Sequence, residues 1–280
     1  MSQAEHPYSG VIAALATKHQ KEKLLAPIFA ELNITIEHAP VDTDQLGTFS
    51  GEIPRIGSPR EVVLRKARLG MTQTGNKFGI ASEGSIGADS TLLFVNSDTE
   101  LMAWVDDVNK IEIVESIKSF DVIANQKSFK RNELYQEFLQ KIDFPTHAVI
   151  LRGDSSSSPI YKGVVDAKEL NNFVSDLFEI SESVIIESDL RAHCSPSRQL
   201  VIKKLARKLV DRLAILCGEC GQPGWGEIDL TFGLCCVECG ELNEKVISGK
   251  VLGCFRCGNR KEVFSDRTVI PAAECFYCNP

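Results

Sequence analysis

Residues 217–220 read CGEC, and the same Cys-x-x-Cys pattern returns as CVEC at 236–239, CFRC at 254–257 and CFYC at 275–278. Two cysteines at this spacing lie on one side of a tight turn. Two such turns can close one tetrahedral site, with sulfur ligands about 2.3 Å from a zinc ion. The gaps of 15, 14 and 17 residues between the pairs are typical of a zinc ribbon. The sequence therefore predicts two structural zinc ions, held by Cys217, Cys220, Cys236, Cys239, Cys254, Cys257, Cys275 and Cys278.

The spacing does not decide which turns share a metal. Sequential pairing, first with second and third with fourth, is favoured because each arm then closes locally; crossed and nested pairings are open as well. Disulfides and redox-active dithiols are the alternatives to metal. Disulfides need an oxidising compartment, and the polar residues 1–10 do not read as a signal peptide. Cys194 and Cys235 stand outside the four pairs.

Composition predicts a soluble, cytoplasmic protein without a membrane partner. Of the 280 residues, 43% are apolar and 25% charged, and no apolar stretch approaches the roughly 20 residues of a membrane span. The formal net charge is −7, and residues 211–280 carry ten acidic and seven basic side chains. Because nucleic-acid binding draws mainly on Lys and Arg, nucleic acid is a less favoured partner of the cysteine-rich tail than protein.

Segments of strand and helix character alternate over the first 213 residues, which predicts a mixed sheet flanked by helices. Strands are expected at 10–16, 34–38, 78–81, 91–95, 101–105, 111–117, 148–151 and 184–186. Helices are expected at 21–32, 59–74, 132–142, 167–180 and 197–213, and a loop at 125–131. The chain would then divide into an α/β domain, 1–213, and a two-zinc ribbon-type domain, 214–280.

Polar clusters follow the first two predicted strands. Thr17, Lys18, His19 and Lys21 stand where a strand ends and a helix begins, and the free N–H groups of a helix start favour phosphate. A capped, solvated helix start is the alternative. The loop 42–55 follows the second strand, and it is either a ligand lid or an ordered loop. Its chemistry-bearing side chains are Asp44 and Glu52, which could hold a metal, and Arg55, which could bind phosphate.

Two further clusters follow later strands. Glu83 comes after the strand at 78–81 and reads as a Mg²⁺ ligand or general base, the alternative being a turn with one exposed carboxylate. Arg191, His193 and Arg198 follow the strand at 184–186 and can bind phosphate or a base edge. Cys194 lies among them as a small packing residue.

With these residues in view, the first hundred positions resemble the inosine/xanthosine triphosphatase family, relatives of the Maf-type nucleotide pyrophosphatases. The similar elements are Ala16-Thr17 with Lys21, the Ser58-capped helix, and Ser82-Glu83-Gly84. The resemblance implies that Thr17 and Lys21 hold a triphosphate and that Glu83 binds Mg²⁺. Arg191-Ala192-His193 is loosely similar to a base-contacting Ser-His-Arg segment, in reversed order, and Lys18 replaces the usual Asn. The whole chain resembles an uncharacterised bacterial family.

Together these patterns predict Mg²⁺-dependent binding, and hydrolysis, of a nucleotide or related phosphoanhydride. Glu83, Lys21 and His193 would be catalytic, and Thr17, Lys18, His19, Arg55, Arg191 and Arg198 would bind the substrate. The zinc module would serve structure or docking to a protein partner. The alternative is a non-enzymatic zinc protein that senses a ligand and docks protein or nucleic acid, since fold analogy cannot choose between these classes.

Overall fold

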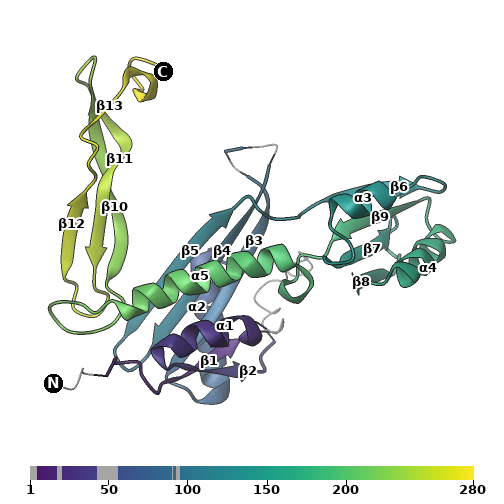
Figure 1. The fold of residues 1–280 in the computed structure, drawn as a ribbon, viewed down its shortest axis with the longest axis horizontal. Coiled ribbons are helices and arrows are strands. Elements are labelled where there is room, and N and C mark those ends of the chain that lie inside the picture. The colour runs from purple at the N-terminus through teal and green to yellow at the C-terminus, as the bar shows by residue number, and fades with distance from the viewer. Residues whose placement is uncertain (1–4, 18–20, 43–55, 90, 93–94) are drawn as a thin grey trace.

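The computed structural model describes residues 5–17, 21–42, 56–89, 91–92 and 95–280. Over these residues the chain forms three separate β-sheets with helices packed around two of them (Figure 1). The central sheet is mixed and flanked by helices, and a small cysteine-bearing β-module follows it at the C-terminus. The predicted fold class is therefore confirmed. Within the described residues, no helix is both long and apolar enough to cross a membrane.

The central sheet has the strand order β2-β1-β3-β4-β5. Strands β1 (Ile12–Ala16), β2 (Thr35–Ala39) and β3 (Phe78–Ala88) run parallel to their neighbours in the order β2-β1-β3. Strands β3, β4 (Asn96–Asp106) and β5 (Ile111–Ser119) then form a long antiparallel meander. Because β1 pairs with β3 only as far as Ile80, the second half of β3 extends beyond the end of β1.

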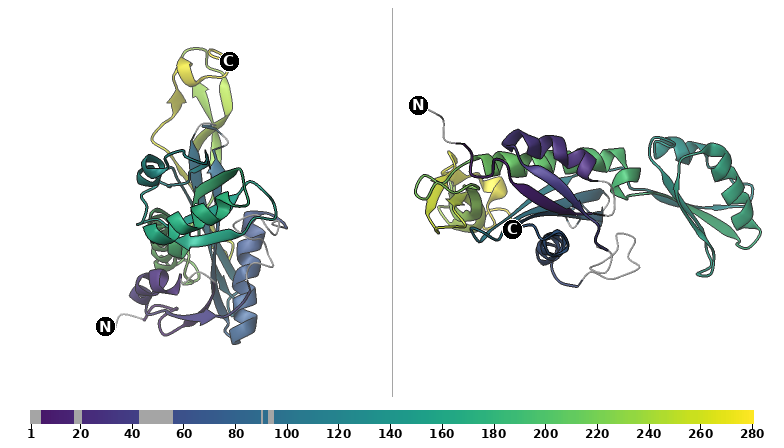
Figure 2. Two further views of the ribbon diagram at one scale, coloured as in Figure 1. Left: turned by 90° about the vertical axis from the view of Figure 1, so that its right-hand side faces the viewer. Right: turned by 90° about the horizontal axis from the view of Figure 1, so that it is seen from below.

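Helices cover both faces of this sheet (Figure 2). Helices α1 (Glu22–Phe29) and α5 (Pro196–Ala214) pack on one face, where Trp104, Met102 and Ile80 meet Phe29 and Leu205 in the largest hydrophobic cluster. Helix α2 (Pro59–Thr74) covers the other face, where its Val63, Ala67 and Met71 pack against alanines of the sheet. Its predicted start is confirmed, because Ser58 and Glu61 form a reciprocal capping box, and Gly75 ends the helix at φ 78°.

A second lobe is inserted between β5 and α5. Its sheet has the order β6-β9-β7-β8, made of β6 (Gln126–Lys130), β7 (Val149–Gly153), β8 (Ile160–Val164) and β9 (Ser183–Ser188). Helices α3 (Gln136–Lys141) and α4 (Ala167–Phe178) complete it, and its hydrophobic cluster is separate from those of the central sheet. The described part of residues 1–213 thus contains two sheets, each with its own core.

Two local predictions are wrong. The expected loop at 125–131 contains strand β6, whose sequence QKSFK buries only Phe129 and so reads as polar, although it pairs along β9. The expected strand at 91–95 is absent from the residues described there; this stretch belongs to the connection between β3 and β4, with Leu92 exposed. Hydrophobicity alone misplaces both segments, because edge strands can be polar and connections can be apolar.

The C-terminal residues form an extended arm. Strands β10 (Gly226–Cys236) and β11 (Leu242–Gly253) make a long antiparallel hairpin, edged by β12 (Arg260–Phe264) and β13 (Val269–Ile270). Helix α5 runs from the inserted lobe to the base of the arm, and the C-terminus lies at the arm's far end (Figure 1).

Candidate metal centres and a buried charged cluster

The eight cysteines of the Cys-x-x-Cys turns come together in two groups whose sulfur atoms lie within 4.8 Å of one another. The proximal group, at the base of the arm, is Cys217, Cys220, Cys254 and Cys257; the distal group is Cys236, Cys239, Cys275 and Cys278. The pairing is crossed, so the preference for sequential pairing is wrong.

The hairpin explains this pairing. Its antiparallel register sets Gly226, near the first turn, opposite Gly253, which precedes the third. At the other end, β13 runs beside Cys236 and delivers the fourth turn to the second. The long hairpin separates cysteine turns that are neighbours in sequence. The first turn therefore meets the third, and the second meets the fourth.

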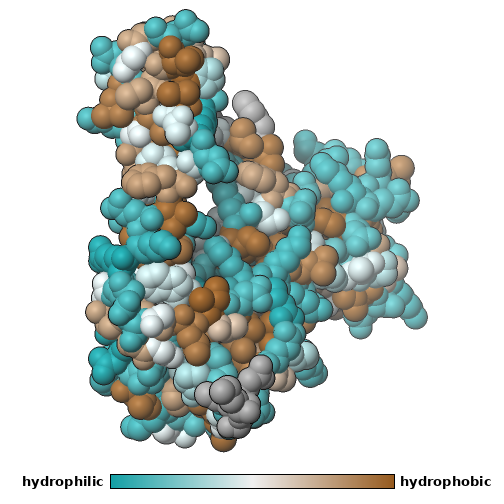
Figure 3. All heavy atoms as spheres, turned by 60° about the vertical axis from the view of Figure 1, so that its left-hand side comes forward, coloured by the Kyte–Doolittle hydropathy of each residue, from teal (hydrophilic) through white to brown (hydrophobic). Residues whose placement is uncertain are grey.

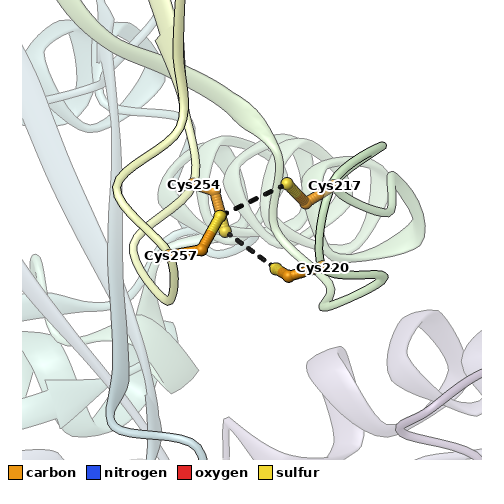
Figure 4. A group of neighbouring side chains, drawn as sticks. All are labelled: Cys217, Cys220, Cys254 and Cys257. Atoms are coloured by element: carbon orange, nitrogen blue, oxygen red, sulfur yellow. Dashed lines mark hydrogen bonds between the residues drawn. The ribbon is translucent and has the colours of Figure 1, made fainter.

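Sulfur separations fit a tetrahedral metal site. Within the proximal group, Cys217 Sγ lies 3.8 Å from Cys257 Sγ and Cys220 Sγ lies 3.6 Å from Cys254 Sγ (Figure 4). The corresponding distal separations are 3.8 and 3.7 Å. A tetrahedron with metal–sulfur distances of about 2.3 Å has edges of about 3.8 Å, whereas a disulfide holds its sulfurs at about 2.05 Å. Each group could hold one metal ion.

The four turns share one backbone design. The residue after the second cysteine donates its N–H to the carbonyl of the first cysteine, over 2.8 to 3.0 Å. That residue is Gly221, Gly240, Gly258 or Asn279, and the three glycines have φ between 69° and 74°. A Cβ is disfavoured at such angles, so the repeated CxxCG pattern is the sequence signal of these turns.

Asn243 supports the distal group, although no sequence pattern points to it. This buried side chain donates from Nδ2 to Cys275 Sγ at 3.5 Å and accepts the backbone N–H of Phe276 at 2.8 Å. A hydrogen bond to a ligand sulfur orients the ligand and helps to balance its charge.

Arg212 fastens the base of the arm to the central sheet. Its buried guanidinium pairs with Glu115 of β5 and donates to the Gly224 carbonyl at 3.2 Å. The same guanidinium lies 5.3 Å from the ring centre of Phe255, which belongs to the third cysteine turn. One side chain therefore links α5, the sheet and the proximal group.

A cluster of buried charged side chains lies at the other end of α5. On the face covered by α1 and α5, Lys21 Nζ donates to Ser82 Oγ at 2.8 Å and Arg198 Nε donates to Glu100 at 2.5 Å. Asp98 lies two residues from Glu100 on the same strand, fully buried, with neither carboxylate oxygen hydrogen-bonded. Gly84 pairs opposite Glu100 and leaves room for the Arg198 side chain.

Glu83 faces the opposite side of the sheet. It pairs with Leu101, and its carboxylate forms a 2.6 Å ion pair with Lys66 of α2, with both side chains nearly buried. Lys21 is electrostatically coupled to this pair as well as to Arg198 and Glu100. In the part of the chain that the structure describes, the two cysteine groups are the sole sets of three or more His, Cys, Asp or Glu ligands within 4.8 Å.

Burial shifts the pKa values of two groups in the cluster toward neutral pH. Burial and the neighbouring Glu100 raise the pKa of Asp98 to about 7. Burial and the neighbouring Arg198 lower the pKa of Lys21 to about 8. Perturbed groups of this kind are concentrated at functional sites, and a carboxyl that titrates near pH 7 is suited to proton transfer.

Of the predicted site residues, the structure therefore places Lys21 and Arg198 in one buried cluster on the face covered by α1 and α5, and Glu83 on the opposite face of the same sheet, close enough to influence Lys21 electrostatically. Arg191 lies in another cluster, bonded to the buried carboxylate of Asp189. Burial alone would raise the pKa of Asp189, but the hydrogen bonds and charge of Arg191, together with a hydrogen bond from Cys194, lower it. The His193 side chain is largely exposed, and partial desolvation by its neighbours and the charge of Arg191 lower its pKa.

Of the other predicted residues, one lies within the described part of the chain and the rest lie outside it. Thr17 is buried at the end of β1, and its carbonyl accepts a 2.9 Å hydrogen bond from His38. The remaining predicted contacts lie outside the described residues: Lys18, His19, Asp44, Glu52 and Arg55. Sequence patterns do not reveal Lys66, Asp98 and Glu100 as site residues. They lie within a helix or a strand, where a charged residue is normally taken to face solvent.

Ser197, His147 and Asp143 form a linear arrangement at the start of α5. His147 Nε2 lies 3.0 Å from Ser197 Oγ, and Nδ1 lies 3.0 Å from Asp143. However, Nε2 also accepts the backbone N–H of Ser197 at 3.1 Å, so His147 acts as a cap of the helix. This contact joins the inserted lobe to α5.

The fold and these sites define a mixed α/β protein with a tetracysteine arm. A family model described as "Domain of unknown function (DUF6671)" matches residues 66–280, and the chain belongs to this family. The match includes all eight cysteine ligands, Glu83, Asp98, Glu100 and Arg198, and begins after Lys21. No curated protein and no solved structure matches the chain.

Gly84→Ala should destabilise the protein by about 1–3 kcal/mol. A Cβ there would lie 2.3 Å from an Arg198 nitrogen and 2.5 Å from Glu100, and burial prevents either side chain from moving aside. Gly87→Ala is the matched control on the same strand, since a Cβ at Gly87 meets nothing within 4 Å. Urea unfolding measures both; equal midpoints for the two variants would contradict the tight packing at Gly84.

Asp98→Asn should change how stability depends on pH. The folded protein holds the Asp98 proton up to about pH 7, whereas an unfolded chain releases it near 3.8, so wild-type stability falls as pH rises between these values. Asn cannot ionise, and the variant should gain on wild type at pH 8 by at most about 4 kcal/mol. Urea unfolding from pH 5.5 to 8 tests this, with Asp107→Asn, at an exposed site, expected to keep the wild-type slope.

Proposed function

We propose that the protein binds two zinc ions, one in each cysteine group, and that both are structural. The observation that supports this most directly is the sulfur spacing of 3.6 to 3.8 Å within each group. Four thiolates close the coordination of zinc and leave no position for a substrate, so the metals stabilise the arm rather than catalyse a reaction. Thiolate ligands also persist in a reducing compartment, which favours the cytoplasm. Residues 1–213 and 214–280 are proposed as separate structural units.

Paired substitutions test both the metal content and the crossed pairing. Wild type should hold two zinc ions per chain by elemental analysis, and the exposed Cys235→Ser control should hold two as well. Cys220→Ser with Cys257→Ser removes ligands from the proximal group alone and should leave one zinc. Cys220→Ser with Cys239→Ser damages both groups and should leave none. Sequential pairing gives the reverse result for the two double variants.

The second candidate function is binding of a nucleotide, or another phosphate-bearing small molecule, with Mg²⁺. The observation that favours it is the gathering of Lys21, Lys66 and Arg198 with three buried carboxylates at one end of the sheet. Mg²⁺ is commonly held by one or two carboxylates together with substrate phosphates, so Glu83 could supply the protein ligand. The resemblance to nucleotide pyrophosphatases supports the same hypothesis.

In this proposal the cluster also hydrolyses a phosphoanhydride. Lys21 and Arg198 would stabilise charge that develops on the phosphate, and Asp98, with its pKa near 7, would accept a proton from the attacking water. In the same proposal, further contacts to the ligand would come from Thr17, Lys18, His19, Arg55, Arg191 and His193. In the non-enzymatic alternative, the same cluster senses the ligand and the arm docks a protein partner, or, less favourably, nucleic acid.

A screen of nucleoside triphosphates for Mg²⁺-dependent pyrophosphate release separates these alternatives. Glu83→Gln should abolish turnover, because the amide keeps the shape and loses the charge, while Lys21→Ala should weaken binding by roughly 1.5–3 kcal/mol. Glu112→Gln, at a half-exposed position of β5, is the control and should behave as wild type. Binding without turnover would favour the sensor, and the absence of both would reject the phosphate site.

A further inference from the structure

We propose that the far end of the arm is a docking surface for a protein segment that presents an arginine beside apolar side chains. The surface, called the distal tip, consists of Val237, Leu242, Val269, Phe276 and Tyr277. The proposal rests on the structural role of the distal metal group given above, because these residues lie in or beside its turns.

The distal tip exposes large apolar side chains that the arm itself does not cover. Phe276 is 70% exposed, Val237 61% and Tyr277 58%. Phe276 and Tyr277 stand edge to face with ring centres 5.8 Å apart, and the Val237 N–H donates to Ile270, which draws the second and fourth turns together. Figure 3 shows hydrophobic side chains gathered at this end of the arm. Large exposed apolar side chains gathered at one end of a protein are typical of interaction surfaces.

The proximal end shows what such a turn contacts. The third turn, CFRC, and the fourth, CFYC, place a phenylalanine directly after their first cysteine. In the third turn this residue is Phe255, whose ring lies 5.3 Å from the Arg212 guanidinium of the protein's own α5. Phe276 occupies the same position in the fourth turn, at the opposite end of the hairpin, and is far more exposed than Phe255. The fourth turn can thus offer a partner the same arginine–phenylalanine contact that the third turn makes with Arg212 of α5.

The negative charge near the distal tip also favours a partner segment that carries an arginine. Exposed carboxylates lie in or next to the second and fourth turns at Glu238, Glu241 and Glu274, and a four-thiolate zinc site adds about two negative charges. Arg267 neutralises only part of this, through its pair with Glu274. Carboxylates close in the chain to exposed aromatic rings favour an arginine, which can stack on the rings and pair with the carboxylates. The same charge repels nucleic acid and a second acidic tip.

The test uses a random 12-residue peptide library displayed on phage and selected on the zinc-loaded full-length chain. We expect enriched peptides to share an arginine next to Leu, Ile, Phe or Trp. Enrichment of sequences without a basic residue, or no enrichment at all, would overturn the proposal. So would a monomer–dimer equilibrium abolished by Phe276→Ala, which would make a second copy the occupant, or tip-dependent binding of a labelled RNA oligonucleotide.

Variants then locate the contact. Fluorescence anisotropy with the strongest peptide should show at least about tenfold weaker binding to Phe276→Ala, because the aromatic anchor is removed. Phe264→Ala is the matched control, since Phe264 is 66% exposed on the outer strand β12 of the same arm. Equal loss in both variants, or none in either, would contradict docking at the tip.

Zinc analysis separates this proposal from the one on which it rests. Both variants should keep two zinc ions, because Phe276 contributes to the distal group only through its backbone N–H. A chain that holds zinc but selects no arginine peptide refutes docking and leaves the structural zinc proposal intact. A chain without zinc refutes the metal proposal directly, whatever peptides it selects.

Discussion

The crossed sharing of cysteines between the two ends of one hairpin is the constraint on which the arm depends. A two-stranded hairpin is marginally stable in water, and three register irregularities interrupt the pairing of β10 with β11. The arm's buried cluster is small: Leu234, Ile270 and two of the cysteines. With the proposed zinc ions bound, the cysteine groups at both ends would prevent the strands from slipping, and the two sites would stabilise the arm as a hydrophobic core stabilises the other two sheets.

The arm has a fixed direction because its base is packed, not merely tethered. Arg212 reaches Glu115, the Gly224 carbonyl and the Phe255 ring from the last turn of α5. Gly224 has φ 95°, and a Cβ there would lie 2.2 Å from Ile113 Cδ1, so the chain passes directly against the sheet. Arg212 is buried together with its carboxylate partner. Removing one partner of a buried ion pair is strongly destabilising, because it leaves an uncompensated charge in the interior. The Arg212–Glu115 pair is therefore a strong determinant of the arm's orientation.

Sequence alone predicts what depends on local chemistry and misses what depends on distant pairing. The eight ligands, the Ser58 capping box and seven of the nine strands described before α5 follow from short patterns. The crossed pairing does not, because it follows from the register of a hairpin whose turns are not neighbours in sequence. Likewise Asp98 and Glu100 look like solvent-facing charges until α5 covers their face of the sheet, and Lys66 does so until α2 packs on the other face beside Glu83. The polar strand β6 is hidden for the same reason, since a single residue, Phe129, carries its burial.

The buried charged cluster is difficult to explain by stability alone. An ion pair buried in a core is often no better than apolar residues of the same volume, and Asp98 adds a carboxyl with no hydrogen-bond partner. Its position is informative: Arg198 stands in the first turn of α5 and Arg212 in the last, about 21 Å apart along the helix. Helix α5 therefore gives the charged cluster and the arm a common rigid support. A ligand that moved Arg198 would act on the same helix that sets the direction of the arm.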